Sequence, residues 1–118
     1  MSPDQARSTY RRQVAASGET ISIRRYTGTG PDRPRFDTEV RARVLGYEMD
    51  EIVGSIQQGD RKVIVLVEDL EAALFAFPVV PLSDKAVVRG KELTIKAVDD
   101  STRRVRGVLI AYELQVGG

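Results

Sequence analysis

Few side chains in this chain could do acid–base or nucleophilic chemistry. The 118 residues include no His and no Cys, so imidazole bases, thiol nucleophiles, disulfides and the commonest zinc sites are absent. A nucleophile would have to be a Ser, a Thr, a carboxylate or a Lys. The four lysines, Lys62, Lys85, Lys91 and Lys96, fall on strands or turns whose alternation places them toward solvent. The sequence predicts that the protein is not an enzyme and has no catalytic residues.

Two adjacent carboxylates, Asp99 and Asp100, could indicate acid catalysis or metal binding. They precede Ser101 between two apolar runs, where Asp side chains commonly accept hydrogen bonds from the backbone two residues on. This stretch is therefore predicted to be a turn. No segment has the alternating Asp or Asn ligands with a Gly that a calcium loop requires. The sequence predicts no metal site and no cofactor.

The glycine-containing segment from Thr27 to Asp37 reads TGTGPDRPRFD. It lacks the Gly-Lys-Ser/Thr and the helix start of a phosphate-binding loop, and it does not follow the dinucleotide-binding pattern. Its glycines and prolines predict a long loop between two strands, and loops of this length tend to be functional or disordered. Phe36 is expected to anchor the base of the loop, in preference to contacting a partner.

The charges nearly cancel but are unevenly distributed. The 18 basic and 17 acidic residues give a net charge of +1, which argues against a dedicated nucleic-acid binder. Residues 1–43 carry +4, residues 44–72 carry −5, and the remainder carries +2. Folding could mix these segments into an even surface, or the basic surface of one copy could meet the acidic surface of the next and close a ring. The candidate subunit-interface residues are Arg7, Arg11, Arg12, Glu48, Asp50, Glu51, Glu68, Asp69 and Glu71.

The length fits a single domain over residues 1–118, with a peripheral helix in 1–17 and a barrel in 19–118. No run approaches the roughly 20 apolar residues that span a bilayer, and the polar N-terminus is unlike a signal peptide. We expect no membrane association and synthesis in the cytoplasm.

Residues Ser2 to Gln5 have the form of a helix start, because Ser2 can cap, Pro3 suits the first turn and Gln5 can complete a capping box. A helix is expected from Pro3 to about Ala16. Its apolar stripe is thin, so the helix is expected either to fray in the monomer or to gain order by docking on a neighbour. The stripe residues are Ala6, Tyr10 and Val14.

The period-2 alternation predicts a strand at Glu19–Tyr26 and a second, antiparallel to it, at Thr38–Leu45. Residues 47–54 change period and predict a short helical turn, with an apolar stripe of Met49, Ile52, Val53 and Ile56. The continuous apolar run Val63–Val67 predicts the central strand, with both of its faces covered.

The second half of the chain predicts three more strands. A helical turn capped by Asp69 is expected at 69–74, followed by an apolar, proline-broken segment at 75–82. That segment is expected to plug the mouth of a barrel, in preference to forming an exposed apolar edge. Strands are expected at 85–89 and 91–98, joined by a Gly90 hairpin, and at 102–116, with Gly107 as a bulge.

These elements predict a mainly β fold: a small antiparallel β-barrel or sandwich of about six strands, with an N-terminal peripheral helix and a long loop between the first two strands.

Several segments stand out for their order of turns and strands: GDRKVIV (59–65) with the acidic turn after it, the prolines at 78 and 81, DKAVVRGKELTI (84–95) and VD (98–99). Through these segments, residues 19–118 resemble the small head-tail connector proteins of tailed bacteriophages and gene transfer agents, and are most similar to the head-closure or stopper group. One departure is Ser83, where such proteins commonly place Gly, and this leaves the turn type there open.

The resemblance implies a structural virion protein at the head-tail junction. It implies a homo-oligomeric ring, six- or twelve-fold, that continues or closes the DNA channel and provides a surface for tail attachment. In such a ring, the loop between the first two strands is implied to face the channel or a neighbouring subunit, with residues Thr27, Gly28, Thr29, Gly30, Pro31, Asp32, Arg33, Pro34 and Arg35. The implied partners are a portal or adaptor protein above, a tail terminator or tail tube protein below, and genomic DNA that passes through without sequence-specific binding. A tail-completion or terminator protein of the same particle, and an OB-like nucleic-acid-binding module, are the alternatives.

Overall fold

Strand β3 (Arg61–Leu66) lies at the middle of the fold, as its uninterrupted apolar run predicts. In the computed structural model, which describes residues 1–118, Val63 and Val65 belong to the barrel core. Ile64 and Leu66 alternate with them and pack on the outside against helix α1 (Pro3–Ser17). Both faces of the strand are therefore covered, which explains why its sequence does not alternate between apolar and polar residues.

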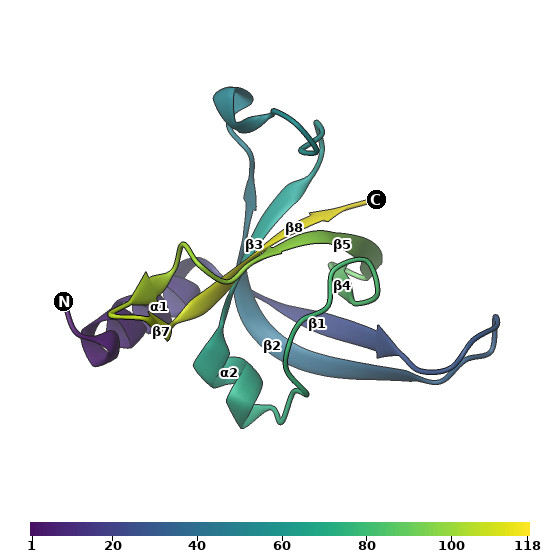
Figure 1. The fold of residues 1–118 in the computed structure, drawn as a ribbon, viewed down its shortest axis with the longest axis horizontal. Coiled ribbons are helices and arrows are strands. Elements are labelled where there is room, and N and C mark those ends of the chain that lie inside the picture. The colour runs from purple at the N-terminus through teal and green to yellow at the C-terminus, as the bar shows by residue number, and fades with distance from the viewer.

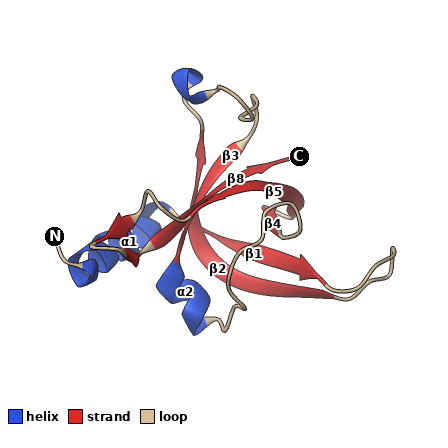
Figure 2. Ribbon diagram, viewed as in Figure 1, coloured by secondary structure: helices blue, strands red, loops and turns tan.

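Six strands close into a barrel in which every neighbouring pair is antiparallel (Figures 1 and 2). The order around the barrel is β1-β2-β3-β8-β5-β4, and β4 returns to pair with β1. The prediction of a mainly β fold with about six strands is confirmed. In barrel order, the strands other than β3 are β1 (Glu19–Tyr26), β2 (Arg35–Gly46), β8 (Ala111–Gly117), β5 (Lys91–Asp99) and β4 (Lys85–Val88).

Helix α1 begins as predicted: the side chain of Ser2 accepts from the Gln5 backbone, and the Gln5 side chain accepts from the Ser2 backbone. Its thin stripe is covered by the chain's own barrel, because Ala6 and Val14 are buried against the outer faces of β3 and β8. The stripe therefore needs no neighbour to cover it, and we expect the helix to be ordered in the monomer. The two small side chains suffice because the outer face they meet is itself apolar.

The loop between β1 and β2 covers residues 27–34 and is shorter than predicted, since β2 already begins at Arg35. Phe36 pairs with Arg25 across the ladder, and its side chain is 72% exposed. The expectation that Phe36 anchors the base of the loop is wrong, because strand pairing, and not side-chain burial, holds this part of the hairpin.

The connection between β2 and β3 projects from the barrel and holds the 3₁₀ turn η1 (Met49–Glu51), at the top of Figure 1. A helical turn was predicted here, but not this exposure: Met49 is 83% exposed and Val53 is 67% exposed. The predicted turn is present as η1, but the segment extends beyond the strand ends, so Met49 and Val53 of its apolar stripe face solvent.

Helix α2 (Val67–Ala72) starts directly after β3 and two residues earlier than predicted, with Leu66 as its N-cap residue. Asp69 therefore lies inside the first turn and does not cap it. The segment that follows combines both interpretations: Phe75 and Val79 are buried in the barrel core, and other apolar side chains face solvent. The exposed ones are Leu74, Phe77, Val80 and Leu82.

The predicted long strand at 102–116 is interrupted. A small hairpin of β6 (Arg104–Val105) and β7 (Val108–Leu109) comes first, and β8 follows. Arg106 and Gly107 both have positive φ, so Gly107 belongs to a two-residue hairpin turn and not to a bulge. The backbone of Ile110 separates β7 from β8, because its carbonyl accepts from the amide of Val67 at the start of α2.

Candidate interaction surfaces

The β1–β2 hairpin extends beyond the barrel as a projecting arm, on the right of Figure 1. Strand β1 pairs with β2 along its whole length, to Tyr26, but with β4 only from Ile21 to Arg24. Residues 27–34 at the tip are all exposed, and the amide of Thr27 donates to the carbonyl of Pro34 at 2.9 Å. The arm is thus a two-stranded extension with a closed tip.

Ion pairs and hydrogen bonds hold the base of this arm against the barrel. Arg24 donates to Asp37 on β2 at 2.8 Å and to Glu92 on β5 at 3.3 Å, and the Tyr26 hydroxyl also donates to Glu92. The hydrogen bond from Arg24 holds the pKa of Asp37 below its usual value, and that from Tyr26 does so for Glu92. These contacts fix the direction in which the arm projects.

Two arginines near the tip have no ion-pair partner in the chain. The guanidinium carbon of Arg33 lies 4.2 Å from the centroid of the Tyr26 ring, and Arg35 is exposed on the first residue of β2. Both residues were predicted to face a channel or a neighbour. Their positive charge is therefore available to another molecule.

The β2–β3 arm is fixed at its base by a buried carboxylate. Asp60 accepts from Lys96 at 2.8 Å and from the Gln57 amide and Gln115 Nε2 at 3.0 Å each. Burial alone would raise the pKa of Asp60, but these hydrogen bonds outweigh it and hold the pKa below its usual value. Gln115 also donates to the carbonyl of Ser55, so the returning half of the arm, residues 55–60, is tied to β5 and β8.

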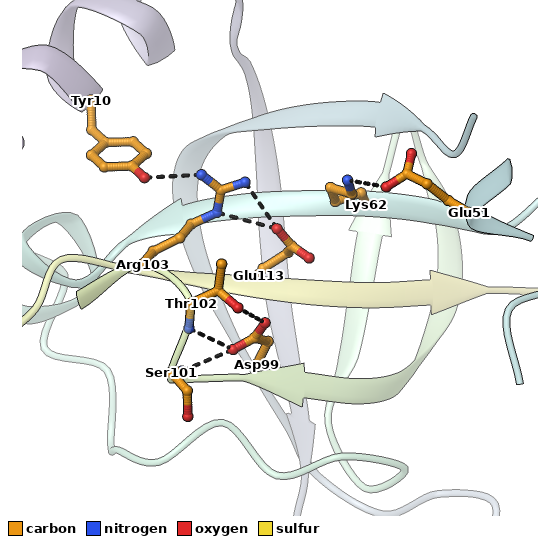
Figure 3. Close-up of polar contacts among 8 residues, drawn as sticks. All are labelled: Tyr10, Glu51, Lys62, Asp99, Ser101, Thr102, Arg103 and Glu113. Carbon is orange, nitrogen blue, oxygen red and sulfur yellow. Dashed lines mark hydrogen bonds and ion pairs between the residues drawn. The ribbon is translucent and has the colours of Figure 1, made fainter. Parts of the chain in front are cut away.

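A second contact near this arm joins η1 to β3: Lys62 donates to Glu51 at 2.9 Å (Figure 3). The Lys62 ammonium also lies 5.3 Å from the centroid of the Tyr47 ring. Glu51, a predicted interface residue, is therefore already paired within the chain. Glu48 and Asp50 on either side of Met49 are exposed and have no ion-pair partner.

The connection from α2 to β4 is clamped by Arg25 and the fully buried Asp84. The guanidinium donates to both oxygens of Asp84, at 2.8 and 2.7 Å, and to the carbonyls of Ala76 and Pro78. Asp84 also accepts from the amide of Val80 at 2.7 Å. This clamp was missed from the sequence, although Arg25 continues the inward parity of Ile21 and Ile23. A charge at an inward position is the signal that could have indicated a buried partner.

Next to this clamp lies an apolar pocket of about 260 Å³. Its lining residues come from the α2–β4 connection, β1 and β2. The guanidinium carbon of Arg25 lies 4.9 Å from the centroid of the Phe75 ring. The pocket is lined by Arg25, Phe36, Thr38, Leu74, Phe75 and Ala76.

The predicted basic and acidic interface residues are partly paired with each other inside the chain. Arg11 on α1 makes two hydrogen bonds to Glu68 on α2, at 2.6 and 3.2 Å, and Arg7 pairs with Asp4 at 2.8 Å. Asp69 is half-buried, and burial, then Glu68, raises its pKa. Arg12 and Glu71 are exposed and make no ion pair. To this extent folding mixes the segregated charge.

A polar cluster on the helix side was also missed from the sequence. Arg103 donates to the Tyr10 hydroxyl on α1 and to Glu113 on β8, each at 2.9 Å (Figure 3). The predicted turn at Asp99 is confirmed: its carboxylate accepts from the amides of Ser101 and Thr102 and from the Thr102 hydroxyl. These hydrogen bonds lower the pKa of Asp99, and the bond from the Thr102 hydroxyl has the largest effect. The carboxylate of Asp99 therefore stabilises the turn.

No family model, curated protein or solved structure matches this chain. No group of three potential metal ligands occurs in the structure, and none of its helices is long and apolar enough to cross a membrane. The two projecting arms and the apolar pocket are the candidate surfaces.

Proposed function

We propose that this protein is a structural virion component of the head-tail junction in a tailed bacteriophage or gene transfer agent. In this role it assembles as a homo-oligomeric ring below the portal or adaptor protein, continues or closes the DNA channel, and presents a surface to which the tail attaches. Genomic DNA passes through without sequence-specific binding.

One observation carries the proposal: a closed, rigid barrel bears a long hairpin arm whose exposed tip projects beyond the strand ladder. The β1–β2 pairing continues past Arg24, where the β1–β4 pairing stops, and the contacts of Arg24 and Tyr26 with Glu92 on β5 hold the direction of the arm. A ring of such subunits can place one exposed loop per subunit toward its axis or toward the next ring. The segments that resemble connector proteins, residues 59–65 and 84–95, form β3, β4 and the β4–β5 hairpin that support this arrangement.

The tail-completion or terminator alternative shares this ring architecture. The OB-like alternative is less favoured by the geometry, because an OB-fold is a five-stranded, partly open barrel and binds bases on exposed aromatic rings. The aromatic cluster here is Phe75, Phe77 and Tyr112, and two of these rings lie in the core.

Deleting the gene of this protein from the genome that encodes the particle tests the role. Particles without it are expected to accumulate as separate heads and tails, with heads that lose packaged DNA. Normal yields of tailed, infectious or transducing particles in its absence would contradict the proposal.

A loop variant tests the contribution of the arm. Replacing Gly28–Arg33 with Asn-Gly leaves a two-residue hairpin turn and removes only exposed residues. Heads with this variant are expected to retain less DNA, measured as the fraction of filled heads by electron microscopy. A six-residue Gly/Ser replacement of the same segment is the control for loop length, and equal retention by all three proteins would exclude a closing role for the arm.

A further inference from the structure

The outer part of β2, in the projecting arm, has a neighbouring strand on one side only. Strand β2 pairs with β1 from Arg35 to Ala42, but with β3 only from Ala42 to Gly46 (Figure 1). Helix α2 lies beside residues 39–41, across a hollow of about 390 Å³. Residues 35–37, farther out along the arm, are all exposed. Their open edge is a template on which another strand can pair.

The hydrogen bonds of the arm show which backbone groups face this open edge. The amide of Thr27 donates to the carbonyl of Pro34, so these two residues form a hydrogen-bonded pair of the β1–β2 ladder. Hydrogen-bonded pairs alternate with non-bonded pairs along an antiparallel ladder. Phe36, two residues after Pro34, is therefore bonded to β1, whereas Arg35 and Asp37 are not. The amides and carbonyls of Arg35 and Asp37 point to the open edge and are free to bond to another strand.

The side chains of this open segment are complementary to a second copy of themselves. Arg35 has no ion-pair partner in the chain, and Asp37, on the same face of β2, accepts from Arg24 at 2.8 and 3.0 Å. Phe36 lies on the other face and is 72% exposed. When two such segments lie antiparallel with Phe36 opposite Phe36, each Arg35 lies opposite the Asp37 of the other copy.

The charges select this register from its neighbours. A shift by one residue in one direction places Arg35 opposite Arg35, and a shift in the other direction places Asp37 opposite Asp37. Like charges that lie directly opposite each other destabilise a strand pair, whereas opposite charges and aromatic pairs stabilise it. The register centred on Phe36 therefore combines one aromatic pair, two opposite-charge pairs and the free backbone groups of Arg35 and Asp37.

We propose that two copies of this chain pair through the open edges of their arms, with Phe36 opposite Phe36 at a two-fold axis and Arg35 of each copy opposite Asp37 of the other. The two β1–β2 hairpins then form one continuous sheet. A contact that uses the same surface on both copies closes at two, so it is a state of the free protein and does not build a ring. The proposal therefore does not rest on the virion role.

Cysteine cross-linking tests the register, since the chain has no cysteine of its own. Opposite residues of a non-bonded pair have Cα atoms about 4.5 Å apart, which is within disulfide range. Phe36→Cys is therefore expected to give a disulfide-linked dimer on mild oxidation. Thr38→Cys, on the same face of the same strand, is the matched control. Two copies of residue 38 lie about 13 Å apart in this register, so it is expected to cross-link no more than Arg12→Cys on α1.

A charge reversal tests the contact without disulfide chemistry. Arg35→Glu places a carboxylate opposite Asp37 of the second copy, at two symmetric positions. The change is expected to raise the Kd of self-association about tenfold or more in sedimentation or light scattering. Arg12→Glu makes the same change of net charge at an exposed position on α1 and is expected to leave the Kd unchanged.

Hydrogen exchange tests the backbone pairing residue by residue. The amides of Arg35 and Asp37 are expected to exchange rapidly in dilute protein and to become protected as the protein concentration rises. The amide of Phe36, which is bonded to β1, is the internal control and is expected to be protected at every concentration.

Each measurement has an outcome that contradicts the pairing. Cross-linking of Thr38→Cys as strong as that of Phe36→Cys, or amides of Arg35 and Asp37 that stay unprotected at the highest concentration, would overturn it. Protection of these two amides only in the presence of another virion protein would assign the edge to that protein and also overturn self-pairing. None of these outcomes bears on the head-tail role, which the gene deletion tests separately.

Discussion

At the scale of single residues, two buried carboxylates hold the projecting parts of the molecule. Asp84 ties the α2–β4 connection to β1 through Arg25, and Asp60 ties the β2–β3 arm to β5 and β8. The sequence places both in turns, where Asp is common, and nothing local distinguishes a buried Asp from a solvated one. Their partners are 59 and 36 residues away, so only the folded topology reveals them.

The Asp84 clamp predicts a large loss of stability on truncation. Asp84→Ala leaves the guanidinium of Arg25 and the amide of Val80 without their acceptor. Removing one member of a buried pair costs about 3–5 kcal/mol, and the side chain of Arg25 is 27% exposed, so the lower end, about 3 kcal/mol, is expected. Urea denaturation measures the change. Asp4→Ala removes an exposed partner of Arg7 and is expected to cost less than about 1 kcal/mol; equal losses would contradict a structural role for the clamp.

The Asp60 site predicts acid sensitivity. The folded-state pKa of Asp60 is lower than its unfolded value, so its ionised form stabilises the fold above the unfolded pKa of about 3.9. That contribution is lost as the pH falls through the folded pKa. Asp60→Asn is expected to cost about 1–3 kcal/mol at pH 7 and to flatten the fall in unfolding free energy below about pH 4.

Asp69 is the opposite case: the same Asp→Asn substitution is expected to raise the free energy of unfolding at pH 7, and not to lower it. Its folded-state pKa is raised, so the ionised form is disfavoured in the fold at neutral pH. Asp69→Asn is therefore expected to increase stability at pH 7 relative to the wild type and to lose that advantage below the unfolded pKa of about 3.9. Urea titrations of both variants from pH 7 to 3 make the comparison, and shifts of the same sign in both would contradict the assignment.

At the scale of elements, the sequence predicts the parts whose local signals agree with their surroundings. The helix start at Ser2, the strand at Glu19–Tyr26 and the Gly90 hairpin all form as expected. The prediction is wrong for residues 102–116, where the apolar–polar alternation of the sequence continues although the strand itself is interrupted. There the carbonyl of Ile110 accepts a hydrogen bond from the amide of Val67, which is distant in the sequence, and this contact lies between β7 and β8.

Of the candidate surfaces, too, only those formed by local signals could be predicted from the sequence. The exposed loop at the tip of the β1–β2 arm could be predicted, because its glycines and prolines act locally. The apolar pocket could not, since it forms only when residues 25, 36 and 74–76 meet. The pairing of Arg11 with Glu68 likewise follows from the docking of α1 and is not visible as a local pattern.

The docking of α1 leads to a prediction about the outer face of β3. Leu66 is 1% exposed and packs in the cluster beneath α1. Leu66→Ala is expected to cost about 2–5 kcal/mol and to reduce amide-exchange protection of α1. In the wild-type monomer, α1 is expected to be protected before any assembly. Met49→Ala, an exposed apolar truncation, is expected to change stability by no more than about 0.5 kcal/mol, and an unprotected α1 in the monomer would contradict the observed packing.

At the scale of the whole molecule, the arrangement of charge leads to a prediction for DNA. The net charge is +1, and eight of the 18 basic side chains are already in ion pairs within the chain. The others do not form one stripe: Arg12 is on α1, Arg33 and Arg35 are on one arm, and Arg61 and Lys91 lie at the opposite barrel end. Without a continuous basic track, few phosphates can be neutralised at once.

We therefore expect the isolated protein to bind DNA at the weak end of the non-specific range, with a Kd of about 10⁻⁴ M at about 150 mM salt. Fluorescence anisotropy with single- and double-stranded oligonucleotides, titrated at several salt concentrations, measures both the Kd and its salt slope. A channel protein benefits from this weakness, because DNA must slide past it. Sub-micromolar binding to single strands with a steep salt slope would instead favour the nucleic-acid-binding alternative, and Arg33→Ala with Arg35→Ala would then show whether the arm is the track.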